Sequence, residues 1–311
     1  MRNLIEEKDY TPHFSGHETF PLRQMWLKKA FDVRCATGVV SKSMFTNESA
    51  IADFGVGKNM VASIKHWALA CGVFEDDLQD KTSFHVSEIW SRILSDDGLD
   101  PYCENPATSW LAHWRLAAVP SGKHRSTTWW WLFNNVLSPT FTREDVQEQL
   151  TVYATRRGVK ASAATLRRDI ETCIRGYCPK PDGGIEDIAE PMLAELGLIL
   201  DEGRGIFSFR RGPKPSLPDG IFDLAVLDYW AGSYGESSLA FETLAHGPGS
   251  PGRVFKMDEN SLAERLLGLE ARTGGVLFWT DSSGIRQVMR RDVDGKTGKR
   301  LVDRLLKEAY A

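Results

Sequence analysis

Cysteine is scarce in this sequence of 311 residues and shows no pairing pattern. The five cysteines are widely scattered, odd in number and without a Cys-x-x-Cys motif: Cys35, Cys71, Cys103, Cys173 and Cys178. We therefore expect neither a disulfide framework nor a structural zinc site. This usage is typical of thiols that stay reduced in the cytoplasm.

Long apolar runs are missing as well. No segment reaches the ~18–20 consecutive apolar residues of a membrane span, and residues 1–9 lack the apolar stretch of a signal peptide. Hydrophobic residues still make up 42% of the chain and charged residues 26%, the composition of an ordinary globular protein. We expect a cytoplasmic protein with no membrane partner and with two or three domains.

Charge of one sign does not dominate the whole chain, whose net charge is -4. Residues 75–104 hold nine acids against two bases, and residues 182–202 hold seven acids and no Lys or Arg. Residues 151–178 instead hold six bases against two acids, and residues 286–307 hold eight against three. Separate basic and acidic surfaces would let the protein hold a polyanion on one side and a partner protein on the other.

Nucleotide-binding and standard nuclease motifs are also absent. The Gly-Val-Gly-Lys-Asn sequence at 55–59 begins like a phosphate loop, but Ala52 stands where the first glycine is needed. Asn59 follows the lysine, where a Ser or Thr would have to hold magnesium. We therefore expect no ATP or GTP binding, and no PD-(D/E)xK, HNH-like or paired-histidine spacing is present.

Residues 49–74 predict a helix-turn-helix. A short apolar helix ends at Gly55, and a second helix starts near Gly57 with a core line of Val61, Ile64, Ala68 and Cys71. Residues 73–74 and 84–86 follow as the two strands of a wing. The outer face of the second helix would contact DNA through Lys58, Asn59, Lys65 and His66.

A second unit of the same kind is predicted over residues 136–211. Thr142 caps one helix, and Ser162 caps a second helix whose core line is Leu166, Ile170, Cys173 and Ile174. A small hairpin follows near residues 198–209. The basic residues expected to face phosphates are Arg156, Arg157, Lys160, Arg167 and Arg168; a solvated helix face is the alternative reading.

The fold class is therefore mainly α with small β-hairpins (α+β), organised as tandem winged-helix or helix-turn-helix modules. We expect an N-terminal domain with a winged helix at 1–135, a second winged-helix-like domain at 136–211, and a helix-plus-hairpin module at 212–311. The tryptophan-rich segment at 128–134 is expected to be core packing.

Four stretches carry a family resemblance. They are Phe14-Ser-Gly-His-Glu-Thr-Phe-Pro-Leu-Arg-Gln-Met-Trp-Leu-Lys-Lys-Ala-Phe-Asp32, Gly55-Val-Gly-Lys-Asn-Met-Val61, Asp100-Pro-Tyr-Cys-Glu-Asn-Pro-Ala-Thr-Ser-Trp-Leu111 and Thr128-Trp-Trp-Trp-Leu-Phe-Asn134. In this order they resemble the bacterial domain of unknown function numbered four thousand and seven. Proteins of this type resemble the SspB component of bacterial Ssp DNA phosphorothioation systems.

The resemblance implies a role beside a cysteine desulfurase, an ATPase and a sulfurtransferase, in phage defence. In such systems a non-bridging phosphate oxygen of one DNA strand becomes sulfur, and the SspB-like member is associated with DNA nicking. The resemblance supplies no nicking residues.

The residues themselves offer one catalytic constellation. His17, Glu18 and Arg23, with His13 nearby, could act as base or metal ligand, hold a divalent cation, and neutralise a phosphate. The alternative is that His17 and Glu18 only orient the helix that begins near Pro21.

Three functions follow from these observations. The chain is a DNA-binding subunit of a phosphorothioation system, with metal-dependent nicking as an added activity; or a winged-helix transcription regulator without catalysis; or a scaffold that docks a sulfurtransferase onto DNA. The fold alone does not choose among them.

Overall fold

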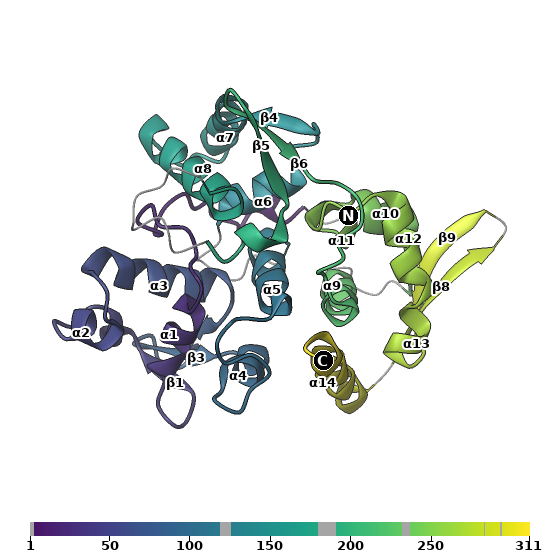
Figure 1. The fold of residues 1–311 in the computed structure, drawn as a ribbon, viewed down its shortest axis with the longest axis horizontal. Coiled ribbons are helices and arrows are strands. Elements are labelled where there is room, and N and C mark those ends of the chain that lie inside the picture. Colours follow the sequence, from purple (N-terminus) through teal and green to yellow (C-terminus); the bar gives the residue numbers. More distant parts are fainter. Residues whose placement is uncertain (1–2, 119–125, 180–190, 232–236, 283, 293) are drawn as a thin grey trace.

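The described part of the chain is an α+β fold of many short helices and three small sheets (Figure 1). The computed structural model describes residues 3–118, 126–179, 191–231, 237–282, 284–292 and 294–311. The mixed α+β class is confirmed. Among the described helices, none combines the length and apolar character needed to cross a bilayer. Residues 182–190 of the second acidic stretch lie outside the described residues.

The strands of the first sheet flank the expected helix-turn-helix in the sequence. Gly55 follows the first helix with φ 63°, a left-handed conformation that favours glycine and turns the chain into the second helix. The predicted helices and hairpin are confirmed, and an additional strand precedes them. The elements are β1 (Val39–Ser41), η2 (Lys42–Phe45), α2 (Ala50–Phe54), α3 (Lys58–Ala70), β2 (Phe74–Asp76) and β3 (Ser83–Val86).

The strands of the second sheet flank the next helix pair in the sequence. Thr142 and Asp145 form a reciprocal capping box, and the Ser162 side chain accepts from the backbone N–H of Thr165, as the sequence predicts. The elements are β4 (Thr140–Thr142), α7 (Arg143–Arg156), α8 (Ala163–Tyr177), β5 (Ile199–Gly203) and β6 (Ile206–Phe209).

The third sheet lies in the C-terminal part, where the predicted hairpin is confirmed. Gly268 separates two short helices that precede this hairpin, α12 and α13. The elements are β7 (Ser238–Ala240), α10 (Phe241–His246), α11 (Pro251–Val254), α12 (Glu259–Leu267), α13 (Leu269–Thr273), β8 (Leu277–Ser282) and β9 (Ile285–Arg290).

All three units share one topology. The strand order is β1-β3-β2, β4-β6-β5 and β7-β9-β8, so the first strand of each unit pairs antiparallel with its last. The middle residue of each first strand, Val40, Phe141 or Leu239, is buried. The C-terminal module therefore repeats the connectivity of the other two.

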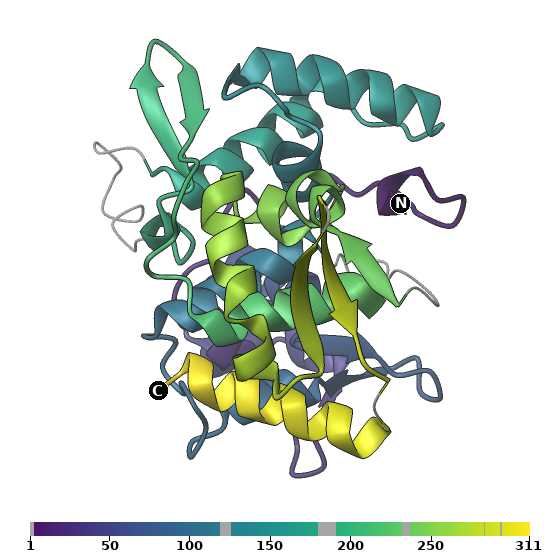
Figure 2. The same cartoon turned by 90° about the vertical axis from the view of Figure 1, so that its right-hand side faces the viewer.

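The remaining helices join the units. α5, α6 and α9 lie between them, with α14 beside α9 (Figures 1 and 2). Each sheet falls within one of the three expected domain ranges, yet one continuous hydrophobic core, rich in buried tryptophan, crosses them. These elements are η1 (Leu4–Glu6), α1 (Trp26–Asp32), α4 (Glu88–Leu94), α5 (Pro106–Ala117), α6 (Thr127–Asn134), η4 (Ala194–Leu196), α9 (Asp219–Ala231) and α14 (Gly295–Ala309).

Candidate functional site

The N-terminal end of α3 is an exposed basic surface. Lys58 and Asn59 are exposed in its first turn, and Lys65 is half-buried two turns later. Gly57 at the N-cap provides no side-chain cap, so the first backbone N–H groups of α3 are directed outward. This end of the helix therefore combines positive side chains with the positive end of the helix dipole.

A hollow lies beside this surface, between η2, α2 and α3. Its volume is about 570 Å³, and its lining includes Val61, Ala62 and Ile51, with Lys58 and Lys65 among the charged groups. Ile51 is 51% exposed. The lysines thus flank a partly apolar depression rather than a flat helix face.

His66 does not belong to this surface, and its assignment to the exposed face is wrong. It is 6% exposed, because the chain segment around Gly16 lies across α3. Gly16 has φ 102°, and a Cβ there would stand 2.7 Å from Nδ1 of His66. The His66 ring stacks on His13 with ring centroids 6.2 Å apart. Only Lys58, Asn59 and Lys65 of the four predicted contacts remain accessible.

His17 is a buried hydrogen-bonding residue. Its Nε2 lies 2.7 Å from Oδ1 of Asp169 on α8, and its Nδ1 accepts from the backbone N–H of Thr19 at 3.0 Å. The Thr128 hydroxyl of α6 donates to the other Asp169 oxygen. Since Nδ1 accepts a hydrogen bond, the ring proton is on Nε2 and is donated to Asp169.

Glu18 and Arg23 do not converge with His17 on a common point. Glu18 is exposed at φ 46°, and the Arg23 guanidinium lies over the rings of Phe20 and Trp26, 5.6 and 5.4 Å from their centroids. Both ring nitrogens of His17 are occupied and the side chain is only 3% exposed. His17 therefore offers no free ring nitrogen to a substrate phosphate in the folded state.

The basic stretch at 151–178 separates into two parts. Arg157 donates to the backbone carbonyl oxygens of Glu6, Glu7 and Tyr10, and Arg156 pairs with the Glu6 carboxylate. Both arginines hold the N-terminal segment against α7, but the Arg156 side chain is still 58% exposed, so only Arg157 is withdrawn from an open phosphate-binding face.

The other part of this stretch remains open. Lys160, Arg167 and Arg168 are exposed, and no ion pair involves them within the described part of the chain. They lie before and along α8, on the side opposite its buried core line. With the exposed Arg156, four of the five predicted bases are therefore accessible to a polyanion.

One segment, residues 13–20, connects the two helix pairs, a feature the sequence did not indicate. Its His17 carbonyl accepts from Ser63 of α3 at 2.8 Å, and its Thr19 carbonyl accepts from Arg175 of α8 at 2.5 Å. Trp67 of α3 donates to the Phe20 carbonyl at 3.1 Å. The segment thus sets the position of α3 relative to α8.

The hairpin of the first unit is acidic. Asp77 lies 2.7 Å from His85, and hydrogen bonds from Ser83 and Thr82 lower the pKa of Asp80 to about 2. Hydrogen bonds from the backbone N–H groups of Gln79 and Asp80 lower the pKa of Asp77. These carboxylates are ionised at neutral pH and repel a DNA backbone.

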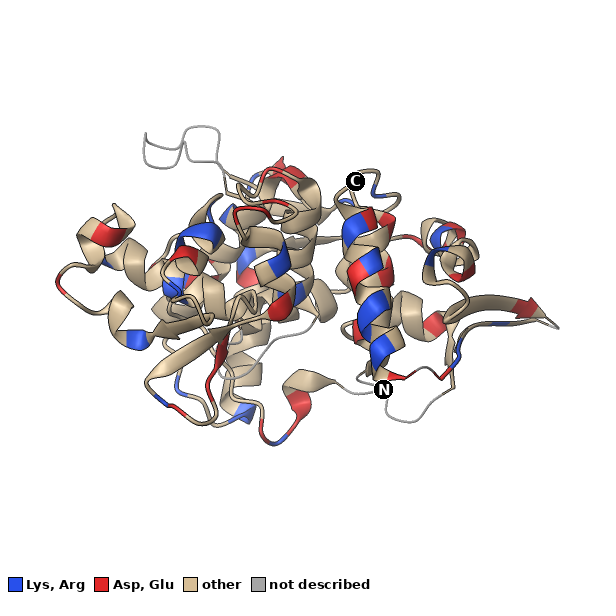
Figure 3. Cartoon of the chain, turned by 90° about the horizontal axis from the view of Figure 1, so that it is seen from below, with Lys and Arg blue, Asp and Glu red and all other residues tan. Residues whose placement is uncertain are grey.

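The basic C-terminal tail forms α14. Figure 3 shows Lys and Arg interleaved with Asp and Glu along this helix. Its apolar side is buried, whereas Lys299 lies 3.6 Å from Glu88 of α4, and Asp303 pairs with Arg92 of the same helix. Part of this charge therefore joins the C-terminal helix to α4.

Comparisons with known proteins agree on one relationship. Two solved structures resemble this chain, described as "SspB crystal structure" and "Magnesium ion-bound SspB crystal structure", with 27% and 26% sequence identity. Each match has a TM-score of 0.82 and covers 96% of this chain and 89% of the other. No curated protein matches the sequence. The family described as "Protein of unknown function (DUF4007)" matches residues 14–310, and the chain belongs to that family.

Proposed function

We propose that this chain is a DNA-binding subunit of a bacterial DNA phosphorothioation system. The observation that carries the proposal is the similarity to SspB structures over 96% of the chain. The system members expected beside it are a cysteine desulfurase, an ATPase and a sulfurtransferase. Its task would be to engage the DNA strand whose phosphate receives sulfur.

DNA engagement is supported by the topology of the units. A strand, a helix pair and a hairpin whose last strand lies between the other two is the arrangement of a winged helix, in which the second helix enters the major groove. α3 and α8 hold that position in the first two units. Lys58, Lys65 and Arg167 would contact phosphates, and Asn59 could read adenine through its amide.

The acidic hairpin around Asp77 and Asp80 has the opposite role in this proposal. Because it repels phosphates, DNA contact in the first unit is confined to α3. The hairpin instead suits a basic protein partner, and we assign the sulfurtransferase to that face. The alternative of a transcription regulator without catalysis requires no such partner.

Two binding experiments test this function. Fluorescence anisotropy with a labelled duplex should give binding that weakens steeply with salt, as phosphate contacts require. Gel filtration of the chain with the sulfurtransferase should give a complex that Asp77→Lys with Asp80→Lys disrupts while DNA affinity stays. Tight binding to a single operator sequence, with no partner complex, would favour the regulator.

Nicking is the second candidate function, because one of the similar structures is described as magnesium-bound. A supercoiled plasmid incubated with and without Mg²⁺ should give relaxed circles only with the ion if the chain cuts one strand. Since His17 is buried and doubly hydrogen-bonded, we assign it a structural role, with Glu18 and Arg23 as the accessible groups to test. If the Glu18→Gln and Arg23→Gln variants both nick DNA at the wild-type rate, the catalytic residues lie elsewhere.

A further inference from the structure

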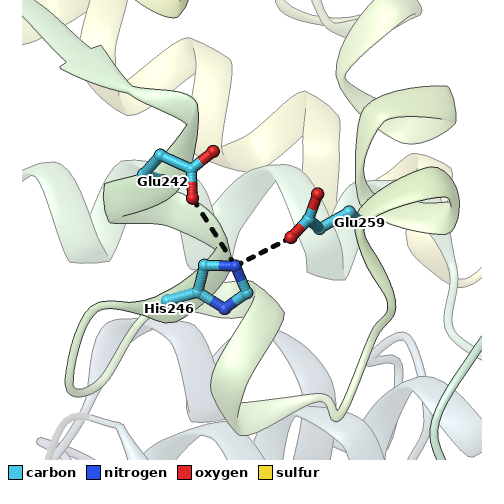
Figure 4. Close-up of side chains that lie close together, drawn as sticks. All are labelled: Glu242, His246 and Glu259. Atoms are coloured by element: carbon cyan, nitrogen blue, oxygen red, sulfur yellow. Dashed lines mark hydrogen bonds and ion pairs between the residues drawn. The ribbon is translucent and has the colours of Figure 1, made fainter.

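Three metal-ligating side chains meet on the third unit, far from the α3 and α8 surfaces. Glu242 and His246 lie one turn apart on α10, and Glu259 is the first residue of α12 (Figure 4). Their ligand atoms all lie within 4.8 Å of one another. In the described part of the chain, no other group of three His, Cys, Asp or Glu side chains comes this close.

Both carboxylates approach the same nitrogen. His246 Nε2 lies 3.0 Å from Oε1 of Glu259 and 3.6 Å from Oε2 of Glu242, and Figure 4 shows the two carboxylates directed at that atom. A single N–H can serve only one of these acceptors well. A cation in place of that proton would accept a lone pair from all three side chains at once.

The Glu242 carboxylate is oriented by a further residue. Arg286 of β9 lies 3.2 Å from Glu242 Oε1, while its guanidinium stacks over the Phe241 ring at 4.2 Å from the centroid. Arg286 thereby holds Oε1 of Glu242, and the other oxygen, Oε2, is directed at His246. Metal-binding carboxylates are commonly held in this way by a second hydrogen-bonding group.

We propose that Glu242, His246 and Glu259 form a binding site for a divalent transition-metal ion of the zinc, cobalt or manganese class. An imidazole with two carboxylates suits these ions, whereas Mg²⁺ prefers oxygen ligands alone. All three side chains are about half-exposed or more, so the remaining coordination positions are open to water or an anionic oxygen. The site is independent of the proposed DNA-binding function.

Cobalt titration of the full chain tests this site. Wild type should bind one Co²⁺ with the weak visible bands of nitrogen and oxygen ligation, and without the near-ultraviolet thiolate band that the exposed Cys35 would produce. His246→Ala should weaken binding by at least about 100-fold, Glu259→Gln by at least tenfold, and Arg286→Gln by about tenfold. Millimolar Mg²⁺ should not displace the ion.

The matched control is His85→Ala. His85 is also a surface histidine, and within the described residues it forms an ion pair with one carboxylate, that of Asp77 at 2.7 Å. Its loss should leave Co²⁺ affinity unchanged, and circular dichroism should report folded protein for every variant. Equal weakening by His85→Ala and His246→Ala, a thiolate band, or displacement by Mg²⁺ at comparable concentration would overturn the assignment.

Discussion

At the scale of single residues, buried hydrogen bonding determines the role of His17. The Asp169 carboxylate is 2% exposed and is satisfied by the His17 ring and the Thr128 hydroxyl. A buried carboxylate that loses its partner keeps the full desolvation cost. The His17 of the Gly-His-Glu sequence is thus explained by hydrogen bonding between α3, α6 and α8.

We predict that His17→Ala strongly destabilises the protein. Removing the imidazole leaves Asp169 buried with one fewer donor, at a cost of about 3–5 kcal/mol. Urea unfolding measures this free energy. Glu18→Gln is the adjacent control, and because Glu18 is exposed its effect should stay within about 0.5 kcal/mol. Equal, small effects would show that the His17 contacts do not stabilise the fold.

Arg157 and Arg156 give a second contrast between neighbouring residues. Arg157→Ala removes hydrogen bonds to three backbone carbonyl groups and should cost about 2–4 kcal/mol. Arg156→Ala breaks only a surface ion pair with Glu6, which is worth about 0–1 kcal/mol. Thermal melts of both variants, with DNA affinity measured in parallel, check this. Loss of DNA affinity in folded Arg157→Ala would return this residue to the DNA surface.

At the scale of elements, local signals predicted helices well and contacts poorly. Gly55, Thr142 and Ser162 end or cap helices through bonds within a few residues, so the sequence alone locates those ends. The strands β1, β4 and β7 are three residues long and pair only with distant hairpins. No local pattern marks such strands, and they were not predicted.

The errors at His66 and Arg157 have one physical cause. Helical periodicity separates a core face from an outer face, but it cannot show that another segment covers the outer face. Residues 3–20 lie across α3 and against α7. Their contacts join residues far apart in the sequence, such as His17 and Asp169 of α8. Seven of the nine residues predicted to contact DNA are accessible: Lys58, Asn59, Lys65, Arg156, Lys160, Arg167 and Arg168.

We expect α8 to bind phosphates through its exposed arginines. Arg167→Glu combined with Arg168→Glu should keep the melting temperature, because neither side chain is buried, and should lower duplex affinity at least tenfold. Arg290→Glu combined with Arg291→Glu in the third unit, where both side chains are also exposed, is the control with the same change in net charge. Wild-type binding by the folded double variant would assign this face to solvent or to a protein.

At the scale of the whole molecule, one buried histidine on the connecting helix α5 links the second and third units. The His113 ring of α5 contacts the Tyr177 hydroxyl of α8 at 2.7 Å and the Val254 carbonyl of α11 at 3.0 Å. Burial lowers the pKa of His113 to about 3. The folded protein therefore holds this imidazole neutral at every pH where the protein works.

This histidine should make stability depend on acid. The unfolded imidazole titrates near about pH 6.5, so below that pH the unfolded chain binds a proton that the folded chain excludes. The neutral His113 ring costs no stability above about pH 6.5. As the pH falls below that value, the free energy of unfolding decreases by roughly 1.4 kcal/mol per pH unit until the folded pKa is reached. Urea unfolding at about pH 7 and about pH 5.5 measures the slope, which should be shallower in His113→Gln. The same slope in both proteins would exclude His113 as its source.

The central claim is that α3 holds DNA by its phosphates, and the salt dependence of duplex binding tests it most directly. Affinity is measured against salt concentration for wild type, for Lys58→Ala with Lys65→Ala, and for Lys81→Ala on the acidic hairpin as control. The double variant should bind more weakly, with a logarithmic salt slope lower by about two, one for each lysine, while the control keeps the wild-type slope. Unchanged affinity and slope in the double variant would contradict the claim and remove α3 from the DNA interface.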